Sequence, residues 1–476
     1  MSPRIPLFGL VLLLLALGPA AEVPGGVAGA AGAQPTTLVK AGSFAKRTSI
    51  GVQSVTGVGF APKLLILFGV ANTSDGFGEG YQYGFGASDG TSSGAISGWS
   101  WDGRGSLGSD ADRRQVARAI TFTKTIAGIE AEADLLSFDD DGFTLDWTTN
   151  NVSPWIINYL AIGGDEVQAE VSSFDAGDSS GLKAYTHVGF RPDAILLFGA
   201  PSINGPLEAS FGMADLYANQ FAMSVASQDT GVNPTNTARY QRTDRCFVAL
   251  DPASEDIHVE SEASMVSMDP EGFTLDWSVP PGPSPLISVA IKGVRARVGW
   301  LTEGNGEVSY GDIGFEPRGA LFVGFNHRAT GDVTDSNRFT IGGVGQNGEG
   351  ASIWLSDQDG VADDTRTDQA TYSNKCYVGE DSPTSPLVYS VAADLKSWDA
   401  NGFTLTWSGF APSPAQIGYL LFGDAAPPAV GGIAELPNDT STSNGAATLC
   451  YVAIVCIAAG IGLTAAIGSM LKRRAR

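Results

Sequence analysis

Short apolar runs alternate with breaks rich in Gly, Pro and Asp along most of the chain. The runs KLLILFG (63–69) and YLAIGG (159–164) are bounded by such breaks, and FTLDW (143–147) alternates apolar with polar side chains. A period of two is typical of a half-buried strand, because successive side chains on a strand point to opposite faces. Helical periodicity is hard to find before residue 446. The pattern therefore predicts an all-β body.

Two phrases of this pattern recur three times, about 130 residues apart. The first is VGFAPKLLILFG at 58–69, VGFRPDAILLFG at 188–199 and IGFEPRGALFVG at 313–324. The second is DDDGFTLDW at 139–147, DPEGFTLDW at 269–277 and DANGFTLTW at 399–407. A repeat of this length is the size of a domain and is far longer than a solenoid repeat.

The fold class expected from these repeats is all-β, with three tandem antiparallel β-sandwich, jelly-roll-like domains. Each copy has room for six to nine short strands, and 61 Gly and 25 Pro fit the turns between them. We place the domains at residues 34–164, 165–293 and 294–424, each with its own core. The strand order does not follow from the sequence.

Both ends of the chain predict targeting segments. Residues 1–33 have one early positive charge and then an apolar stretch, which predicts a signal peptide and leader. Residues 446–471 carry no charge and predict a transmembrane helix, and the basic residues 472–476 predict a short cytoplasmic tail. Residues 425–445, rich in Pro, Gly, Ser and Thr, predict a flexible stalk. We therefore expect a single-pass surface protein whose bulk is extracellular.

The sequence LPNDT at 436–440 resembles a degraded form of the L-P-x-T-G sortase signal. It has one inserted residue and lacks the Gly, so a retained membrane anchor and sorting to a cell wall both stay open.

The charge balance argues against one class of partner. The chain has 28 Lys and Arg against 51 Asp and Glu, a net charge of −23. Such a surface repels the phosphates of nucleic acids and keeps the protein soluble. No nucleic-acid partner is expected.

The Asp-rich second phrase raises the question of calcium. In Asp269-Pro270-Glu271-Gly272, the residue types match a type I turn, with the Gly free to take a positive φ. A calcium loop needs side-chain oxygens in its middle, and Pro270 has none. The phrase predicts a turn between two strands. We expect no cofactor, with Ca²⁺ as the alternative.

Catalytic patterns are weak, so the chain is not expected to be an enzyme. The G-x-S-x-G matches at 86–90 and 90–94 lack the helix that a nucleophile elbow needs. The three His residues form no zinc motif. Cys246 and Cys376 stand at corresponding positions of different repeats, which predicts buried thiols and no disulfide.

The loop that diverges most between the copies lies at 100–114, 227–242 and 356–369. Binding surfaces are commonly built from variable loops on a repeated scaffold. The alternative is that these are only solvated connections. Trp side chains beside the loops could stack on sugar rings, with burial in the core as the alternative for each of them. The candidate ligand-binding residues are Trp99, Trp101, Asp102, Asp229, Trp354, Asp357 and Asp359.

The motif series GFxPxxxLFxG, DGFTLxW and YLxxG resembles the tandem β-sandwich repeats of uncharacterised bacterial surface and phage tail-like proteins. The resemblance implies a fold and carries no catalytic residue. We predict a membrane-anchored extracellular binding or adhesion protein, or an envelope structural protein, with a glycan or a cell-surface protein as ligand. One alternative is a surface lectin or glycan-active enzyme, and a second is a virion or tail-like component.

Overall fold

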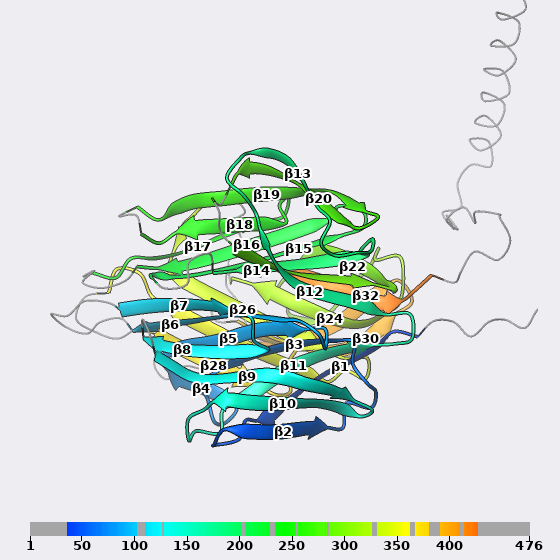
Figure 1. Ribbon diagram of the computed structural model, residues 1–476, viewed down its shortest axis with the longest axis horizontal. Coiled ribbons are helices and arrows are strands. Elements are labelled where there is room, and N and C mark those ends of the chain that lie inside the picture. The colour runs from blue at the N-terminus through cyan, green and yellow to red at the C-terminus, as the bar shows by residue number, and fades with distance from the viewer. Residues whose placement is uncertain are drawn as a thin grey trace, which may run out of the picture. The chain divides into compact units, whose positions relative to one another are not determined.

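The computed structural model describes residues 36–426, apart from 102–109, 126–127, 201–204, 229–233, 254–255, 281, 283–284, 326–330, 362–366, 380–390 and 410–413. The described residues form antiparallel sheets and no helix, which confirms the all-β prediction (Figure 1). None of them forms a helix long and apolar enough to cross a membrane. The predicted signal peptide and the predicted transmembrane helix at 446–471 lie outside the described residues.

Repeat 1 (34–164) forms a six-stranded sheet in the order β1-β11-β3-β5-β6-β7 and a four-stranded sheet in the order β2-β10-β9-β8. Its strands are β1 (Leu38–Ala45), β2 (Gly51–Thr56), β3 (Leu64–Val70), β4 (Gly76–Glu79), β5 (Tyr81–Ser88), β6 (Ser93–Trp101), β7 (Asp110–Val116), β8 (Ile120–Thr125), β9 (Gly128–Asp139), β10 (Gly142–Thr149) and β11 (Ile156–Gly163).

Repeat 2 (165–293) has the large sheet β12-β21-β14-β15-β16-β17-β25 and the small sheet β13-β20-β19-β18. Its own strands are β12 (Gln168–Asp175), β13 (Gly181–Tyr185), β14 (Ala194–Gly199), β15 (Leu207–Asp215), β16 (Gln220–Ser227), β17 (Thr237–Arg242), β18 (Phe247–Asp251), β19 (His258–Asp269), β20 (Gly272–Val279) and β21 (Pro285–Lys292).

Repeat 3 (294–424) has the large sheet β22-β32-β24-β26-β27-β28-β4 and the small sheet β23-β31-β30-β29. Its own strands are β22 (Val294–Thr302), β23 (Gly306–Tyr310), β24 (Pro317–Gly324), β25 (Thr334–Asp335), β26 (Asn337–Val344), β27 (Gly350–Asp357), β28 (Thr367–Tyr372), β29 (Tyr377–Gly379), β30 (Val391–Asp399), β31 (Gly402–Gly409) and β32 (Gln416–Asp424). The three repeats thus use one strand order.

The Asp-Gly phrase forms a two-residue hairpin turn, as predicted. In repeat 2 it joins β19 to β20, with Asp269 paired to Gly272. The Asp269 carboxylate accepts hydrogen bonds from Ser267 Oγ at 2.7 Å and Thr274 Oγ1 at 2.6 Å. The corresponding carboxylates in the other repeats accept the same pair of bonds. The Asp therefore serves to close the turn.

A positive φ was expected for the Gly of this turn, and it is found in two of the three copies, at Gly142 (φ 154°) and Gly402 (φ 156°). Gly272 does not have a positive φ, so the predicted role was wrong for this residue. A Cβ added at Gly272 would lie 1.8 Å from the main-chain oxygen of Tyr185 on the facing strand β13. A Cβ added at Gly142 or Gly402 would lie 2.0 Å from a main-chain oxygen of the neighbouring strand, of Val55 and Tyr310 respectively. Close approach of two strands excludes any side chain at this position.

Each repeat has a hydrophobic cluster of its own between its two sheets. Trp147, Trp277 and Trp407 of the repeated phrase are buried in these clusters, as the alternation predicts. Cys246 and Cys376 are free and buried, which confirms their prediction. The apolar side chains of FTLDW thus face a core within each repeat.

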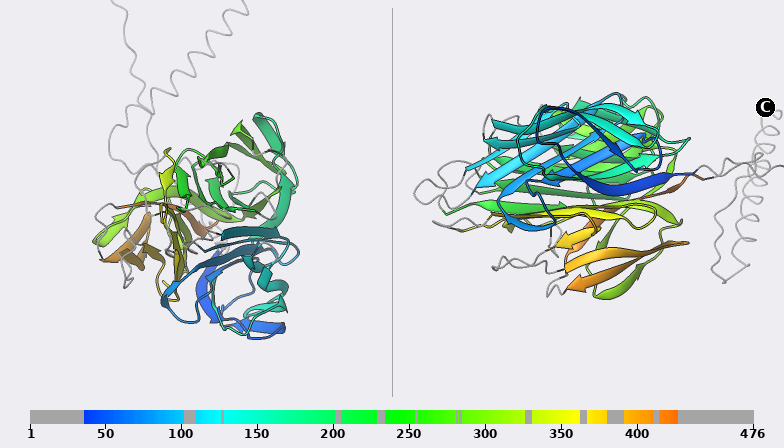
Figure 2. Two further views of the ribbon diagram at one scale, coloured as in Figure 1. Left: turned by 90° about the vertical axis from the view of Figure 1, so that its left-hand side faces the viewer. Right: turned by 90° about the horizontal axis from the view of Figure 1, so that it is seen from below.

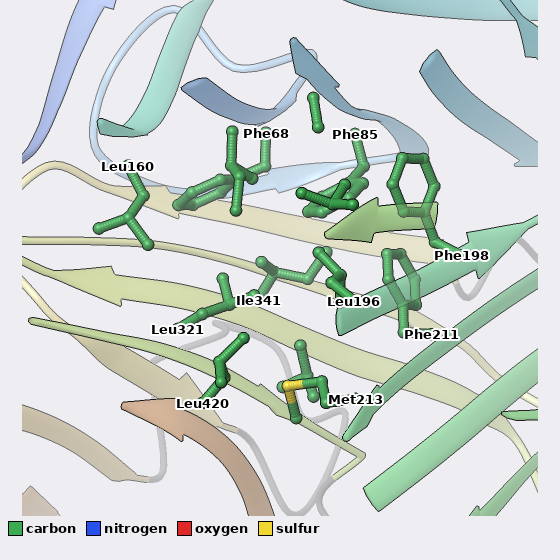
Figure 3. Packing of buried hydrophobic residues seen from close by; sticks show 14 of the residues in the cluster. Phe68, Phe85, Leu160, Leu196, Phe198, Phe211, Met213, Leu321, Ile341 and Leu420 are labelled. Atoms are coloured by element: carbon green, nitrogen blue, oxygen red, sulfur yellow. The ribbon is translucent and has the colours of Figure 1, made fainter. Parts of the chain in front are cut away.

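A further cluster is shared by all three large sheets (Figure 3). Phe85 of repeat 1 meets Phe198 and Phe211 of repeat 2 edge-on, with ring centroids 4.9 and 5.0 Å apart. Phe339 of repeat 3 meets Tyr83 of repeat 1 at 5.1 Å. We call this cluster the shared core. The large sheets are therefore covered on both faces, by the small sheet of their own repeat and by the other repeats.

Two strands pair with the large sheet of a repeat other than their own. The strand β4 of repeat 1 pairs with β28 of repeat 3, and β25 of repeat 3 pairs with β17 of repeat 2. In both cases the segment after the third strand of one repeat extends the large sheet of another. The left panel of Figure 2 shows the three repeats, blue to cyan, green, and yellow to orange, grouped about a common centre. Residues 36–426 thus form one unit, which we call the three-repeat unit.

The contacts between repeats run in a closed cycle. Asp89 of repeat 1 accepts a hydrogen bond from Val171 N of repeat 2 at 2.7 Å, and Asp215 of repeat 2 accepts one from Val298 N of repeat 3 at 2.9 Å. At the third junction, Lys40 of repeat 1 forms a 2.5 Å ion pair with Glu349 of repeat 3.

The described chain also begins and ends at that third junction. Thr37 N donates to Asp424 Oδ1 and Thr37 Oγ1 donates to Gly423 O, both at 2.9 Å. Hydrogen bonds between repeats 3 and 1 thus occupy the place that a peptide connection holds at the other two junctions.

Candidate functional site

The three divergent loops are equivalent hairpins of the three large sheets. They join β6 to β7, β16 to β17 and β27 to β28. In Figure 1, β7 and β17 lie toward the left-hand side. Residues 102–109, 229–233 and 362–366 of these hairpins lie outside the described residues. We call this side of the three-repeat unit the hairpin end.

The hairpins of repeats 2 and 3 contact each other directly. Gly360 N donates to Thr235 O at 2.9 Å, and Thr235 N donates to Val361 O at 3.0 Å. Thr235 Oγ1 donates to Gln358 O at 2.7 Å. Main-chain groups therefore hold these two hairpins together.

The three candidate Trp residues lie in different surroundings. Trp101, the last residue of β6, is 46% exposed, and its ring meets that of Trp99 edge-on at 6.4 Å. Trp99 is 9% exposed. Trp354 is 1% exposed and packs edge-on against Phe77 of repeat 1 at 5.5 Å. Of the three, Trp101 presents a ring to solvent, whereas Trp354 is part of the interior between repeats 3 and 1.

The candidate Asp residues are likewise divided. Asp102 and Asp229 lie outside the described residues. Asp359 accepts a hydrogen bond from Thr237 N of repeat 2 at 2.8 Å. Burial raises the pKa of Asp359, and the nearby charge of Asp335 adds to this rise. Asp359 therefore links two repeats at the hairpin end.

Asp357 is fully buried and belongs to a polar network that sequence reasoning missed. Ser227 Oγ of repeat 2 donates to Asp357 Oδ2 at 2.6 Å, and Asn337 Nδ2 donates to Ser227 Oγ at 3.1 Å. Tyr81 OH of repeat 1 donates to Asn337 Oδ1 at 2.9 Å. The network thus joins all three repeats beneath the hairpin end.

The sequence held a signal for this network. Ser100, Ser227 and Asp357 take the same place in their repeats, at the hairpin end of the sixth strand or its equivalent. They continue the row of side chains that faces the shared core. A polar residue at the end of such a row is a departure from the alternation, and it recurs in every copy.

One more buried charge pair was also missed. Arg113 Nη1 of repeat 1 lies 2.6 Å from Glu208 Oε2 of repeat 2, and Glu208 has no solvent exposure. Burial raises the pKa of Glu208 to about 7, against the opposing effect of the Arg113 charge. Ser210 Oγ donates a second hydrogen bond to this carboxylate at 2.8 Å. The pair holds repeats 1 and 2 together.

The described residues contain no group of three or more His, Cys, Asp or Glu side chains placed to hold a metal ion. Comparison with known proteins adds no identity: no family model matches the chain, and no curated protein matches it.

Proposed function

We propose that the chain is a membrane-anchored extracellular binding or adhesion protein that presents its hairpin end to a ligand. Residues 1–33 would direct export, three sandwich repeats would form the extracellular body, and residues 446–471 would anchor it. One observation carries the proposal. The most divergent loops of the three repeats are equivalent hairpins, and they are carried by sheets that share one core.

A shared core favours binding because it fixes the distances between the three loops. Separate domains on flexible linkers would lose orientational freedom when all three bind at once. Loops on one packed unit have lost that freedom already, so three weak contacts can add to a useful affinity. The hydrogen bond of Arg113 to Glu208 and the contacts of Thr235 hold the hairpin-bearing strands in place.

Trp101 favours a glycan as the ligand class. Its ring is 46% exposed at the base of the first hairpin. An exposed, held aromatic ring offers a flat apolar face with little entropy left to lose. A lectin-like role is therefore the more specific form of the proposal.

A glycan array and a cell-binding assay test the proposal, with the chain ending at residue 426. In one variant, short Gly/Ser turns replace residues 102–109, 229–233 and 362–366, which leaves the contacts of Thr235 and Gly360 unchanged. We expect this variant to fold and to lose binding. Undiminished binding by the folded variant would place the ligand elsewhere and refute the proposal.

A single substitution tests the glycan class. Trp101→Ala should weaken glycan binding by about 5- to 30-fold, as expected for the loss of about 1–2 kcal/mol of stacking. Trp300 is the matched control, since it is also 46% exposed but lies on β22, at the opposite edge of the repeat 3 large sheet from β27 and β28. Equal effects of Trp101→Ala and Trp300→Ala would argue against stacking at Trp101.

A further inference from the structure

Asp357 is an unusual buried carboxylate. It has 0% exposure, and its Oδ2 accepts a hydrogen bond from Ser227 Oγ, but its Oδ1 has no hydrogen-bond partner. Among the described residues, no Lys, Arg or His forms an ion pair with it. An ionised carboxylate in such a place is costly unless a positive charge or a proton neutralises it.

The basic residue of the neighbouring strand is held by main-chain oxygens. Arg239 lies on β17, beside the strand that carries Ser227. Its Nη1 donates to the main-chain oxygens of Asp335 at 2.7 Å and Ser336 at 2.5 Å. These two hydrogen bonds hold the Arg239 guanidinium at the main chain of β25 and the residue after it.

A second buried oxygen without a partner lies beside Asp357. Thr367 pairs directly with Asp357 across β27 and β28, so the two side chains point to the same side of the sheet. Thr367 is 2% exposed, and its Oγ1 has no hydrogen-bond partner. Ser227 Oγ and Asn337 Oδ1 belong to the same network. All these candidate ligands are hydroxyl, amide or carboxylate oxygens.

The chemistry of this set selects the kind of ion. Oxygen ligands suit hard cations and do not favour zinc or copper. Calcium sites are usually built from several carboxylates, whereas here one carboxylate is surrounded by neutral oxygens. A monovalent cation would neutralise the single negative charge of the Asp357 carboxylate.

We propose that Asp357 Oδ1 and Thr367 Oγ1 form part of a buried site for an alkali cation, Na⁺ or K⁺, between the large sheets. The site lies in the network that joins Tyr81 of repeat 1, Ser227 of repeat 2 and Asn337 of repeat 3. A bound cation neutralises Asp357 and strengthens the contact of the three repeats beneath the hairpin end. This inference stands independently of the ligand proposed above.

Thermal unfolding of the full-length chain in a mild detergent tests the site. Increasing NaCl or KCl is compared with choline chloride at the same ionic strength, because choline is too large for a buried site. A ligand that binds the folded state stabilises it with the logarithm of its concentration. We expect the melting temperature to rise in this way with Na⁺ or K⁺ and not with choline. The stronger of the two responses identifies the ion.

Three variants make the test specific. Asp357→Asn removes the charge, and Thr367→Val removes the second oxygen while keeping the shape and the charge of the site. Both should lose the response to the alkali cation. Asp335→Asn is the control. It removes an exposed acid on the neighbouring strand β25, and this variant should keep the response to the alkali cation. Thr367→Val remains informative even where Asp357→Asn fails to fold.

Several results would overturn the proposal. One is equal stabilisation by choline, which would indicate general screening or a proton on Asp357. Another is a response to calcium alone. A response that survives in a folded Thr367→Val protein would also refute the assigned ligands. Sodium NMR line broadening that is lost in Asp357→Asn would confirm direct binding.

Discussion

Truncation of Phe85 to Ala tests whether the shared core makes the three repeats a single folding unit. Phe85 has no solvent exposure and lies on β5 of repeat 1, yet its two aromatic neighbours, Phe198 and Phe211, belong to repeat 2. A buried Phe→Ala change costs about 3–5 kcal/mol. Since two edge-to-face contacts are lost as well, each about 0.5–1.5 kcal/mol, we expect a loss near the upper end of that range.

The distribution of this loss along the chain is the decisive measurement. Hydrogen exchange of main-chain amides reports the free energy of opening of each strand. If the shared core couples the repeats, Phe85→Ala should lower protection in β10, β20 and β31 by similar amounts. These strands carry the repeated phrase in repeats 1, 2 and 3, respectively.

A matched control removes the same ring from a core that belongs to repeat 1 alone. Phe143 is also fully buried, and it contacts Phe44 and Tyr159 of its own repeat. Phe143→Ala should produce a comparable loss of protection in β10. A Phe85→Ala protein that loses protection in β10 but keeps wild-type protection in β20 and β31 would refute the coupling.

Three further predictions follow from local features. Gly272→Ala should destabilise by about 1–3 kcal/mol in urea unfolding, because its Cβ would lie 1.8 Å from Tyr185 O, whereas Gly311→Ala meets nothing within 4 Å and should be neutral. The pKa of Glu208 is raised to about 7, so its contribution to stability is full below pH 4.5 and is lost as the pH rises through 7. Glu208→Gln should therefore reduce the fall in the free energy of unfolding between pH 4.5 and 7.5 by at most about 3 kcal/mol. An unchanged pH dependence of stability would contradict the raised pKa of Glu208. Protease treatment of intact cells should release the body if 446–471 spans the membrane, and protection of the body with cleavage of the tail would reverse the topology.

The strands and turns were predictable because they depend on short-range patterns. The alternation in FTLDW and the Asp-Gly turn each specify a local structure whatever surrounds it. The shared core depends on which surfaces meet, and a buried Phe85 has the same local sequence pattern whichever repeat covers it. One clue was present, since LLILFGV in β3 is apolar at successive positions and buried along its whole length. Such a run indicates a strand covered on both faces, which a single sandwich with a solvated outer face does not provide.

The sequence indicated the three loops as candidates, and the structure shows that they are equivalent hairpins with different surroundings. Divergence between copies identified the hairpins. Sequence divergence could not distinguish Trp101, which is exposed, from Trp354, which is buried against Phe77. That difference arises because β4 of repeat 1 covers the edge of the repeat 3 sheet. Asp357 was interpreted as a loop residue, whereas it ends β27 and faces the interior.

The junction at Thr37 and Asp424 has a consequence for the connectivity of the fold. Where repeat 1 meets repeat 2, Gly164 leads from β11 into β12 through the chain itself, and the bonds of Thr37 to Gly423 and Asp424 take that role between repeats 3 and 1. The three repeats therefore meet at three equivalent junctions. Two of these are bridged by the backbone, and the third is bridged by hydrogen bonds. A circular permutant that joins residue 426 to residue 36 and opens the chain after Gly164 should keep every strand pairing. The position of the two termini is thus independent of the packing of the core, because the open junction can lie between any two of the three repeats.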